Sequence, residues 1–292
     1  MVLQYIIKDN KYKSINEILK QEFHISSRLL HKIISEKHVM LNGNIIDTRE
    51  SVKNGDLITI DLNFEEESEN IVSTSMNLDI IFEDDALLIL NKPAGIAVHP
   101  SILHYTDSIS NGVKYYFNST GLKRKIRPVN RLDLNTSGLI IFAKNEYIQE
   151  CLIQQMNSHI FTKEYIAIVT GHLDKPCGSI NLPIARKNNS IIERCISNSG
   201  QEAITNYSVI QELKTCSIVK CSLQTGRTHQ IRVHMSAIGH PLLGDTLYGS
   251  LSPLINRQAL HSYRICFIHP ITKKKLEFIC ELPEDMQKKN NW

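Results

Sequence analysis

Short strand-like segments follow one another through residues 77–292, and they constrain the fold of the chain more than any other feature. Turn-forming residues separate the segments, and the connections are short. The segments are Ile80–Phe82, Leu87–Leu90, Leu139–Ala143, Tyr165–Val169, Asn206–Ile210, Ser217–Leu223, Tyr263–Phe267 and Lys275–Ile279. One clear helix is predicted over Asn145–Ser158, where apolar residues recur at helical spacing. Consecutive strands with few helices predict an α+β domain built on a mixed, mainly antiparallel sheet.

Residues 12–61 have the pattern of a separate, small α/β unit. Ser14-Ile15-Asn16-Glu17 has the sequence of a capping box, which predicts that a first helix begins there. Ser26 or Ser27 can cap a second helix. Asn42-Gly43 lies between two short apolar runs, and this pair suits the two positive-φ positions of a type I′ hairpin turn.

The segment over residues 62–76 is acidic and contains no Lys or Arg. It carries Glu65, Glu66, Glu67 and Glu69 together with Ser and Asn, and its few apolar residues show no sustained period. Such a composition buries little apolar area and predicts a flexible linker. The chain is therefore expected to divide into a small N-terminal unit, this acidic linker and a larger domain over residues 77–292.

Charge is unevenly distributed along the 292 residues, although the formal net charge is only +3. Residues 77–292 carry 24 Lys and Arg against 18 Asp and Glu. This excess is modest and is compatible with a polyanionic partner.

The seven cysteines are scattered singly, and no Cys-x-x-Cys pair occurs. This pattern argues against a disulfide framework and a zinc site, and it favours a reducing compartment. The N-terminus lacks the pattern of a signal peptide, and no apolar run approaches the roughly 18 residues that span a bilayer. We expect a cytoplasmic protein without a membrane segment.

A single carboxylate stands out in Arg131-Leu132-Asp133, which precedes the turn Asn135-Thr136-Ser137-Gly138 and the apolar strand after it. Reactive groups are often placed on such loops, because the strand holds the loop still while the side chain stays accessible. The run Lys123-Arg124-Lys125-Ile126-Arg127 lies just upstream and could attract RNA to this carboxylate. The alternative is a surface ion pair beside an ordinary turn.

Two further segments could carry chemistry. In Thr225–His234 a Thr-Gly turn precedes a helix that should begin around Thr228, with Arg227 and Arg232 flanking its start. A helix N-terminus with two arginines favours a carboxylate or phosphate guest, although two surface arginines on an ordinary helix would give the same pattern. Lys92–Pro100 follows a strand and reads either as a rigid site loop or as a stiff connection.

The histidines near the second segment do not predict a metal site. His229, His234 and His240 are five and six residues apart, whereas helical ligand pairs need a spacing of three or four. Asp245 is the first carboxylate among or after them. We therefore expect no bound metal.

Together, these segments resemble the RluA-type pseudouridine synthases. The resemblance rests on Lys92–Pro100, Arg127–Lys144, Lys163–Ala167, Leu223–Gly249, Ala259–His261 and Phe267–Pro270. It covers about Leu78 to Leu282, and its most specific parts are Arg-Leu-Asp-x-x-Thr-Ser-Gly and Gly-Arg-Thr-His-Gln-Ile-Arg-Val-His. The N-terminal unit resembles the small RNA-binding domain of ribosomal small-subunit protein four, on Ser27–Leu30 and Val39–Gly43.

The resemblance implies an isomerase that converts uridine to pseudouridine within RNA and needs no cofactor. It makes Asp133 the catalytic carboxylate, Arg232 its partner, and Tyr165 the ring that stacks on the target uracil. Tyr165 is also a candidate for removing the proton from the uracil ring. Whether Asp133 attacks the anomeric carbon or assists departure of the base to a glycal stays open. The target nucleotide would have to be flipped out of its helix to reach this site.

The resemblance also implies a set of RNA contacts. In the larger domain they are Arg131, Arg227, His229, Lys92, Lys123, Arg124, Lys125 and Arg127. On the second helix of the N-terminal unit they are Arg28 and Lys32, which share a face, although a solvated face is the simpler reading of such a helix. Many family members have His where this chain has Asn130. That residue lies next to the catalytic carboxylate in the sequence, so it bears on substrate details.

Ribosomal RNA of the large subunit is the expected substrate, because of the N-terminal RNA-binding unit. Transfer RNA is the alternative. A non-catalytic ribosome-assembly protein and a metal hydrolase using Asp133 with the histidines are rival functions. The enzyme is expected to act as a monomer.

Overall fold

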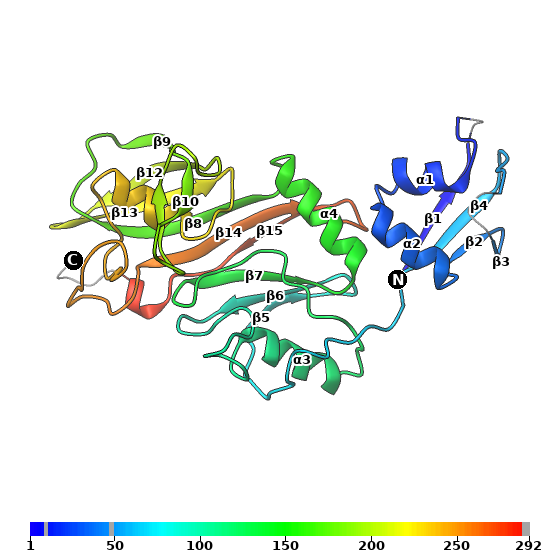
Figure 1. Ribbon diagram of the computed structural model, residues 1–292, viewed down its shortest axis with the longest axis horizontal. Helices are drawn as coiled ribbons and strands as arrows, with labels where there is room; N and C mark the ends of the chain where they lie inside the picture. Colours follow the sequence, from blue (N-terminus) through cyan, green and yellow to red (C-terminus); the bar gives the residue numbers. More distant parts are fainter. Residues whose placement is uncertain (9–10, 47–49, 288–292) are drawn as a thin grey trace.

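The computed structural model describes residues 1–8, 11–46 and 50–287. A small N-terminal unit lies at one end of the molecule, and a long twisted sheet forms most of the rest (Figure 1). The α+β class and the mainly antiparallel sheet predicted from the sequence are confirmed. None of the helices in the described part of the chain is long and apolar enough to cross a membrane.

The N-terminal unit is a four-stranded antiparallel sheet with two helices. In sheet order its strands are β1 (Val2–Ile6), β4 (Leu57–Asp61), β2 (Val39–Leu41) and β3 (Asn44–Ile45). The helices are α1 (Ile15–Gln21) and α2 (Ser27–Ser35). Their buried Ile, Leu and Val side chains form a core with the sheet. The unit expected over residues 12–61 does not include β1, an edge strand that turns Leu3 and Tyr5 toward the core.

Two of the three predicted local motifs of the N-terminal unit form: the Asn42-Gly43 turn and the Ser26 cap. Asn42 and Gly43 have φ of 50° and 83°, as a type I′ turn requires. Ser26 caps α2 by accepting a hydrogen bond from the backbone N–H of Leu29 at 3.2 Å. Helix α1 begins directly after Ser14, as predicted, but the capping box does not form, because the Ser14 side chain makes no capping bond. Glu17 instead accepts from the backbone N–H of Lys13 at 2.8 Å.

The large sheet has nine strands. In order they are β5 (Ile80–Glu83), β6 (Leu87–Lys92), β7 (Ser137–Ala143), β14 (Leu260–Ile268), β8 (Thr162–Thr170), β13 (Cys216–Leu223), β12 (Ile204–Glu212) and β9 (Cys177–Asn181), and β15 (Lys275–Ile279) also pairs with β14. Neighbouring strands are antiparallel except for β7 and β14, which are parallel and pair His261 with Ser137. All seven residues of β7 are buried, so this strand is the centre of the core.

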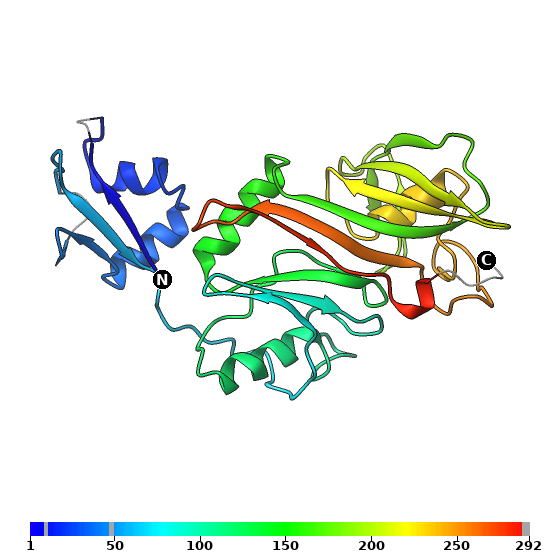
Figure 2. The same cartoon turned by 180° about the vertical axis from the view of Figure 1, so that it is seen from behind.

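Helices and a small hairpin complete the larger domain. The helices are α3 (Ile109–Ser119), α4 (Glu146–Asn157), α5 (Gln230–Ala237) and the short 3₁₀ helix η1 (Glu284–Met286), and the hairpin strands are β10 (Ile184–Arg186) and β11 (Arg194–Ile196). Helix α3 lies beside β5 and β6, whereas α4 lies between the sheet and the N-terminal unit (Figures 1 and 2). The sequence predicted α4 but not α3. Asn111 and Gly112 are poor helix formers, and Gly112 is required there because a Cβ would lie 2.9 Å from Met76.

The acidic segment after β4 is packed against the protein, in contrast to the flexible linker expected over residues 62–76. Leu62 and Phe64 are buried, and the backbone N–H of Glu66 donates to the carbonyl of Lys123 at 3.1 Å. The Glu66 carboxylate forms a bidentate pair with Arg127, at 2.7 and 2.8 Å, and also pairs with Lys32. The composition of the segment hid this packing, because the partners of Glu66 are distant in the sequence.

We predict that Glu66→Gln lowers the free energy of unfolding by roughly 2–4 kcal/mol, since it leaves Lys32 without its carboxylate partner and leaves the buried Arg127 only the longer pair with Glu146, at 3.8 Å. Glu65→Gln is the matched control. Glu65 and its partner Lys123 keep 70% and 60% of their side chains exposed. Losing this ion pair should therefore lower the free energy of unfolding by less than about 1 kcal/mol. Urea unfolding measures both, and equal losses would contradict the prediction.

The effect of Glu66→Gln should also depend on pH. Burial raises the pKa of Glu66, but hydrogen bonds from Arg127 and Lys32 outweigh it and leave the pKa below its ordinary value. The stabilisation by Glu66 is therefore complete above the ordinary glutamate pKa and is lost as the pH falls through the lowered one. Urea unfolding below that range should give wild type and Glu66→Gln similar stabilities.

Candidate active site

The loop that carries Asp133 is held from three sides. The Lys92 ammonium donates to the carbonyl of Leu134 at 3.0 Å, and Arg257 donates to the carbonyl of Asn135 at 2.9 Å. Within the loop, the N–H of Thr136 donates to the carbonyl of Asp133 at 3.1 Å. Asp133 is therefore presented on a fixed backbone.

Gly138 explains why the loop ends in Thr-Ser-Gly. It has φ of 104°, and a Cβ at this position would lie 2.3 Å from the carbonyl oxygen of Ser262 on β14. Only glycine lets β7 approach β14 this closely. The close approach fixes the position at which the Asp133 loop leaves the sheet.

Asn130, which stands where many RluA-type enzymes have His, ties the segment before Asp133 to β7. Its amide donates to the carbonyl of Leu139 at 3.1 Å and accepts from the N–H of Ile141 at 2.9 Å. The side chain is buried. In this chain Asn130 is thus a structural residue that supports the segment leading into the Asp133 loop.

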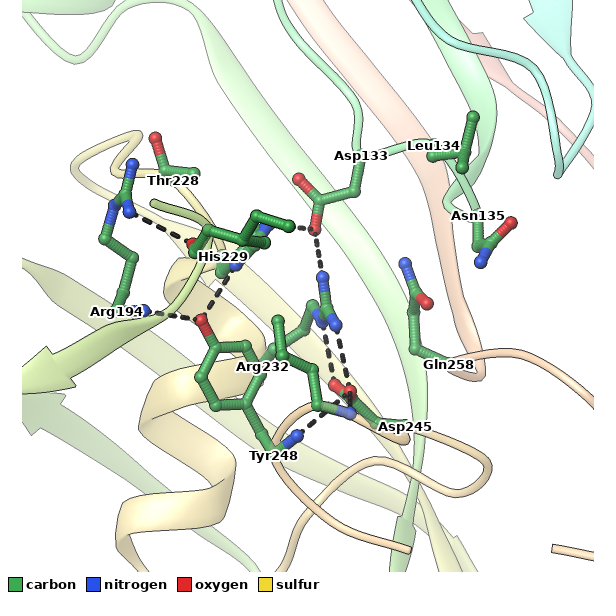
Figure 3. A network of polar contacts seen from close by, with 12 residues as sticks. Asp133, Leu134, Asn135, Arg194, Thr228, His229, Arg232, Asp245, Tyr248 and Gln258 are labelled. Atoms are coloured by element: carbon green, nitrogen blue, oxygen red, sulfur yellow. Dashed lines mark hydrogen bonds and ion pairs between the residues drawn. The ribbon is translucent and has the colours of Figure 1, made fainter. Parts of the chain in front are cut away.

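Arg232 lies between two carboxylates (Figure 3). Its Nη1 donates to Oδ2 of Asp133 at 3.0 Å. Its Nε and Nη2 donate to the two oxygens of Asp245, at 2.7 and 2.9 Å. Burial opposes the charge of Arg232, but the two carboxylates outweigh it and raise the pKa of the guanidinium. Arg232 is therefore a permanent cation in a fixed orientation.

Asp245 is almost completely buried, and its side chain is fully used. Besides Arg232 it accepts from the backbone N–H groups of Leu247 and Tyr248, at 3.0 and 3.2 Å. A carboxylate with this many donors cannot turn toward a substrate. Asp245 orients Arg232, while Asp133 keeps 24% of its side chain exposed.

His229 is held on the other side of Asp133 by Tyr248 (Figure 3). The Tyr248 hydroxyl accepts the N–H of Arg194 at 2.8 Å and lies 2.8 Å from Nδ1 of His229, to which it can donate its own proton. Burial lowers the pKa of His229, with Arg232 and Arg194 contributing, while Asp133 and Asp245 oppose it. The neutral ring then carries its proton on Nε2, which lies 3.8 Å from Oδ2 of Asp133.

The turn before α5 positions both His229 and Arg232. Gln230 is buried, and its carbonyl oxygen accepts from the N–H of Arg227 and the hydroxyl of Thr225, at 2.9 and 2.8 Å. His229 occupies the left-handed region, with φ of 57°, directly before the helix. The helix therefore begins at Gln230 and not around Thr228 as the sequence suggested.

A cavity of about 680 Å³ opens above Asp133. Asp133, His229 and Arg232 line it together with Tyr165 and the apolar Leu260. Tyr165 is 6% exposed, and burial together with Asp133 raises the pKa of its hydroxyl. The phenol is protonated at neutral pH, so Tyr165 could accept a proton only after losing its own.

The structure places only some of the predicted RNA contacts where RNA could reach them. Arg131, Arg227 and His229 line the cavity, and both arginines are exposed. Lys92 is fully buried and bonds three backbone carbonyls, so it supports the loop and does not contact RNA. Lys125 is exposed.

The other expected phosphate contacts already have partners within the protein. Lys123 pairs with Glu65 at 3.1 Å, and Arg124 donates to the carbonyl of Phe64. Arg127 and Lys32 pair with Glu66, and Arg28 pairs with Glu146 at 3.5 Å. The basic run over residues 123–127 is therefore mostly a docking site for the acidic segment, which corrects its interpretation as an open RNA surface.

Comparisons with known proteins identify the family of this chain. Residues 86–237 match the RNA pseudouridylate synthase family, and residues 3–58 match the N-terminal domain of the RluD ribosomal pseudouridine synthase. The chain belongs to the RNA pseudouridylate synthase family. It is an RNA pseudouridine synthase, an isomerase, and the resemblance to RluA-type enzymes is confirmed.

Relatives match over most of the chain. Uncharacterized RNA pseudouridine synthase YjbO of Bacillus subtilis is 38% identical and covers 91% of this chain and 95% of its own length. Ribosomal large subunit pseudouridine synthase D of Zymomonas mobilis is 39% identical, with 81% and 78% covered. The solved structure of human RNA Pseudouridylate Synthase Domain Containing 1 aligns with a TM-score of 0.58 at 26% identity, covering 70% of this chain and 83% of that one.

Sequence reasoning missed three residues of the site, namely Asp245, Tyr248 and Arg257. In the sequence Asp245 is only the first carboxylate among or after the histidines His229, His234 and His240. Nothing in the local pattern shows that it lies against Arg232, because that contact depends on how the loop after α5 folds back.

We predict that Asp245→Asn lowers the turnover rate by roughly 10–100-fold, because Arg232 loses the anion that orients it. RNA affinity should change less than about twofold, since Asp245 is buried away from the cavity. Glu277→Gln removes a carboxylate from the exposed bidentate pair with Arg264 and serves as the control. Single-turnover rates and RNA binding measure the two effects, and a loss confined to binding would refute the positioning role.

Proposed function

We propose that this enzyme isomerises specific uridines of large-subunit ribosomal RNA, with Asp133 as the catalytic nucleophile. Relatives named ribosomal large subunit pseudouridine synthase D support the substrate, including one that is 39% identical. The match of residues 3–58 to an N-terminal domain of a ribosomal pseudouridine synthase also supports it. The observation that carries the proposal is the Asp133 carboxylate, which faces a cavity while Arg232 holds one of its oxygens.

The chemistry needs an ionised carboxylate close to the ribose of the target nucleotide. Carboxylates form covalent intermediates at sugar centres. Arg232 binds Oδ2 of Asp133, which leaves Oδ1 directed to the cavity for attack on the anomeric carbon or for assisting departure of the base. Because Asp245 fixes Arg232, little reorganisation is required when charge shifts during glycosidic cleavage.

Tyr165 and Leu260 supply an apolar surface for the uracil ring. A uridine within a helix cannot reach Asp133, so the nucleotide would be flipped out of its stack. Tyr165 offers the ring face on which the released uracil can stack and turn before the new C–C bond forms.

No cofactor is required by this reaction. Uridine and pseudouridine have the same atoms and the same oxidation level, and the proton lost from ring carbon 5 balances the one gained at ring nitrogen 1. The groups needed are a carboxylate, a counter-charge and a route for that proton. Asp133 and Arg232 would supply the first two.

Asp133→Asn tests the catalytic role. We expect pseudouridine formation to fall by more than about 1,000-fold, because the amide is a far weaker nucleophile of nearly the same size. RNA affinity should stay within about twofold of the wild type. Tritium release from uridine labelled at ring carbon 5 measures turnover, and filter binding measures affinity. A variant with near-normal turnover would exclude Asp133 as the nucleophile.

The identity of the RNA is tested separately in cells. Pseudouridines are mapped across all RNA in a strain lacking the gene, and again after complementation with the wild type or with Asp133→Asn. We expect sites in large-subunit ribosomal RNA to be lost and then restored by the wild type alone. Loss of transfer RNA sites only would overturn the substrate but leave the catalytic assignment standing.

A further inference from the structure

A second groove of about 490 Å³ lies next to the catalytic cavity. Among the residues that the structure describes, its walls carry four arginines, Arg131, Arg186, Arg194 and Arg227, and no Asp or Glu. Arg186 and Arg194 come from the β10–β11 hairpin, where they face each other in register. Four cations around one open groove repel one another, so an anion in the groove would be strongly favoured.

The groove arginines differ from most other arginines of the protein in having no acidic partner. Among the described residues, Arg28, Arg127, Arg232, Arg257 and Arg264 all form ion pairs with carboxylates. The four groove arginines form none within the part of the chain that the structure describes. Their bonds go only to neutral acceptors, such as the Thr228 hydroxyl for Arg131 at 2.9 Å and the Glu202 carbonyl for Arg227 at 2.9 Å.

Arg186 is the most available of the four. Its side chain is exposed and makes no hydrogen bond or ion pair with any residue of the described ranges. Arg194 differs, because its guanidinium donates to the carbonyls of Ile192 and Glu193, at 3.0 and 3.1 Å. Replacing Arg186 therefore removes a charge from the groove without breaking a contact of the fold.

The groove and the catalytic cavity share a wall. Arg131, Arg227 and Thr228 line both, and the bond between Arg131 and Thr228 lies along that wall. The hairpin is also tied to the catalytic residues, since the N–H of Arg194 donates to the hydroxyl of Tyr248, which holds His229 (Figure 3). A strand whose nucleotide occupies the cavity would pass directly into the groove.

The hairpin loop indicates a polymer and not a small anion. Ile191 and Ile192 are 83% and 64% exposed, in the loop between β10 and β11. Exposed apolar side chains next to unpaired arginines suit a nucleic-acid strand, which offers both phosphates and apolar base faces.

We propose that this groove, formed by Arg131, Arg186, Arg194 and Arg227, binds the phosphodiester backbone of the RNA strand adjoining the target uridine. The proposal deepens the RNA site and rests on RNA being the substrate, but not on which RNA is modified. The arginines hold the strand on one side of the Arg131–Thr228 wall while the flipped nucleotide occupies the other.

Arg186→Gln in the full-length protein tests the proposal, with a fluorescein-labelled oligouridylate of about 12 nucleotides as the probe. We expect the dissociation constant to rise about fivefold at low salt, and the slope of its logarithm against log salt to fall by about 0.7, as for one lost phosphate contact. With ribosomal RNA from the deletion strain, kcat/KM should fall by a similar factor while kcat stays within about twofold.

Two variants and a competitor make the test specific. Arg186→Lys should recover most of the affinity, because it keeps the charge. Lys214→Gln removes an exposed cation at the opposite end of β13 from Arg227 and should leave the affinity unchanged. Inorganic phosphate should displace the probe no better than chloride of equal ionic strength.

Three results would overturn the proposal: unchanged affinity in Arg186→Gln, an equal loss in Lys214→Gln, or selective displacement by inorganic phosphate. Thermal melting confirms that each variant is folded. Because the probe is a simple oligouridylate, failure of the large-subunit assignment would appear in the pseudouridine maps and not in this binding assay.

Discussion

The position of Arg232 between Asp133 and Asp245 is the constraint on which the site depends. Without the guanidinium, two carboxylates from distant parts of the chain would face each other in a largely buried region and repel. Arginine suits this position better than lysine, because its planar fork satisfies both oxygens of Asp245 and still donates to Asp133. One carboxylate is fully used in holding the cation, while the other stays partly exposed at the cavity.

The sheet brings these groups together. Asp133 precedes β7 and Arg232 follows β13, two strands separated in the sheet by β14 and β8. Gly138 lets β7 approach β14, and the buried Lys92 fixes the loop between Asp133 and β7 through the carbonyl of Leu134, while it also donates to the carbonyls of Pro93 and Ile96 in its own loop. The Lys92 ammonium is buried in the centre of the protein, which is unfavourable for a polar group. Its hydrogen bonds to carbonyls satisfy it there. The Asp133 loop is therefore positioned by the core and not by its own turn alone.

The sequence predicts the elements that depend on a local pattern of residues. It fails where contacts with residues distant in the sequence determine the structure. The large-sheet strands except the short β9, together with helix α4, follow from apolar periodicity, and the loops of Asp133 and Arg232 follow from their motifs. Helix α3 was missed because Asn111 and Gly112 disfavour a helix unless the surroundings require a close approach. The predicted RNA contact at Lys92 is wrong because the burial of this side chain cannot be inferred from a Lys-Pro loop. Asp245 was missed because its contact with Arg232 exists only after the chain has folded back.

Charge compensation separates the structural cations from those available to RNA. The run over residues 123–127 is the densest cationic segment in the sequence, yet RNA could use Lys123 or Arg127 only by displacing Glu65 or Glu66. That exchange replaces one carboxylate with one phosphate and gains little. The arginines beside the β10–β11 hairpin lose no carboxylate when RNA arrives, so each phosphate contact there is a net gain. The salt dependence of RNA binding should therefore arise mainly at the groove next to the cavity above Asp133, although the sequence marks only Arg131 and Arg227 of its four arginines.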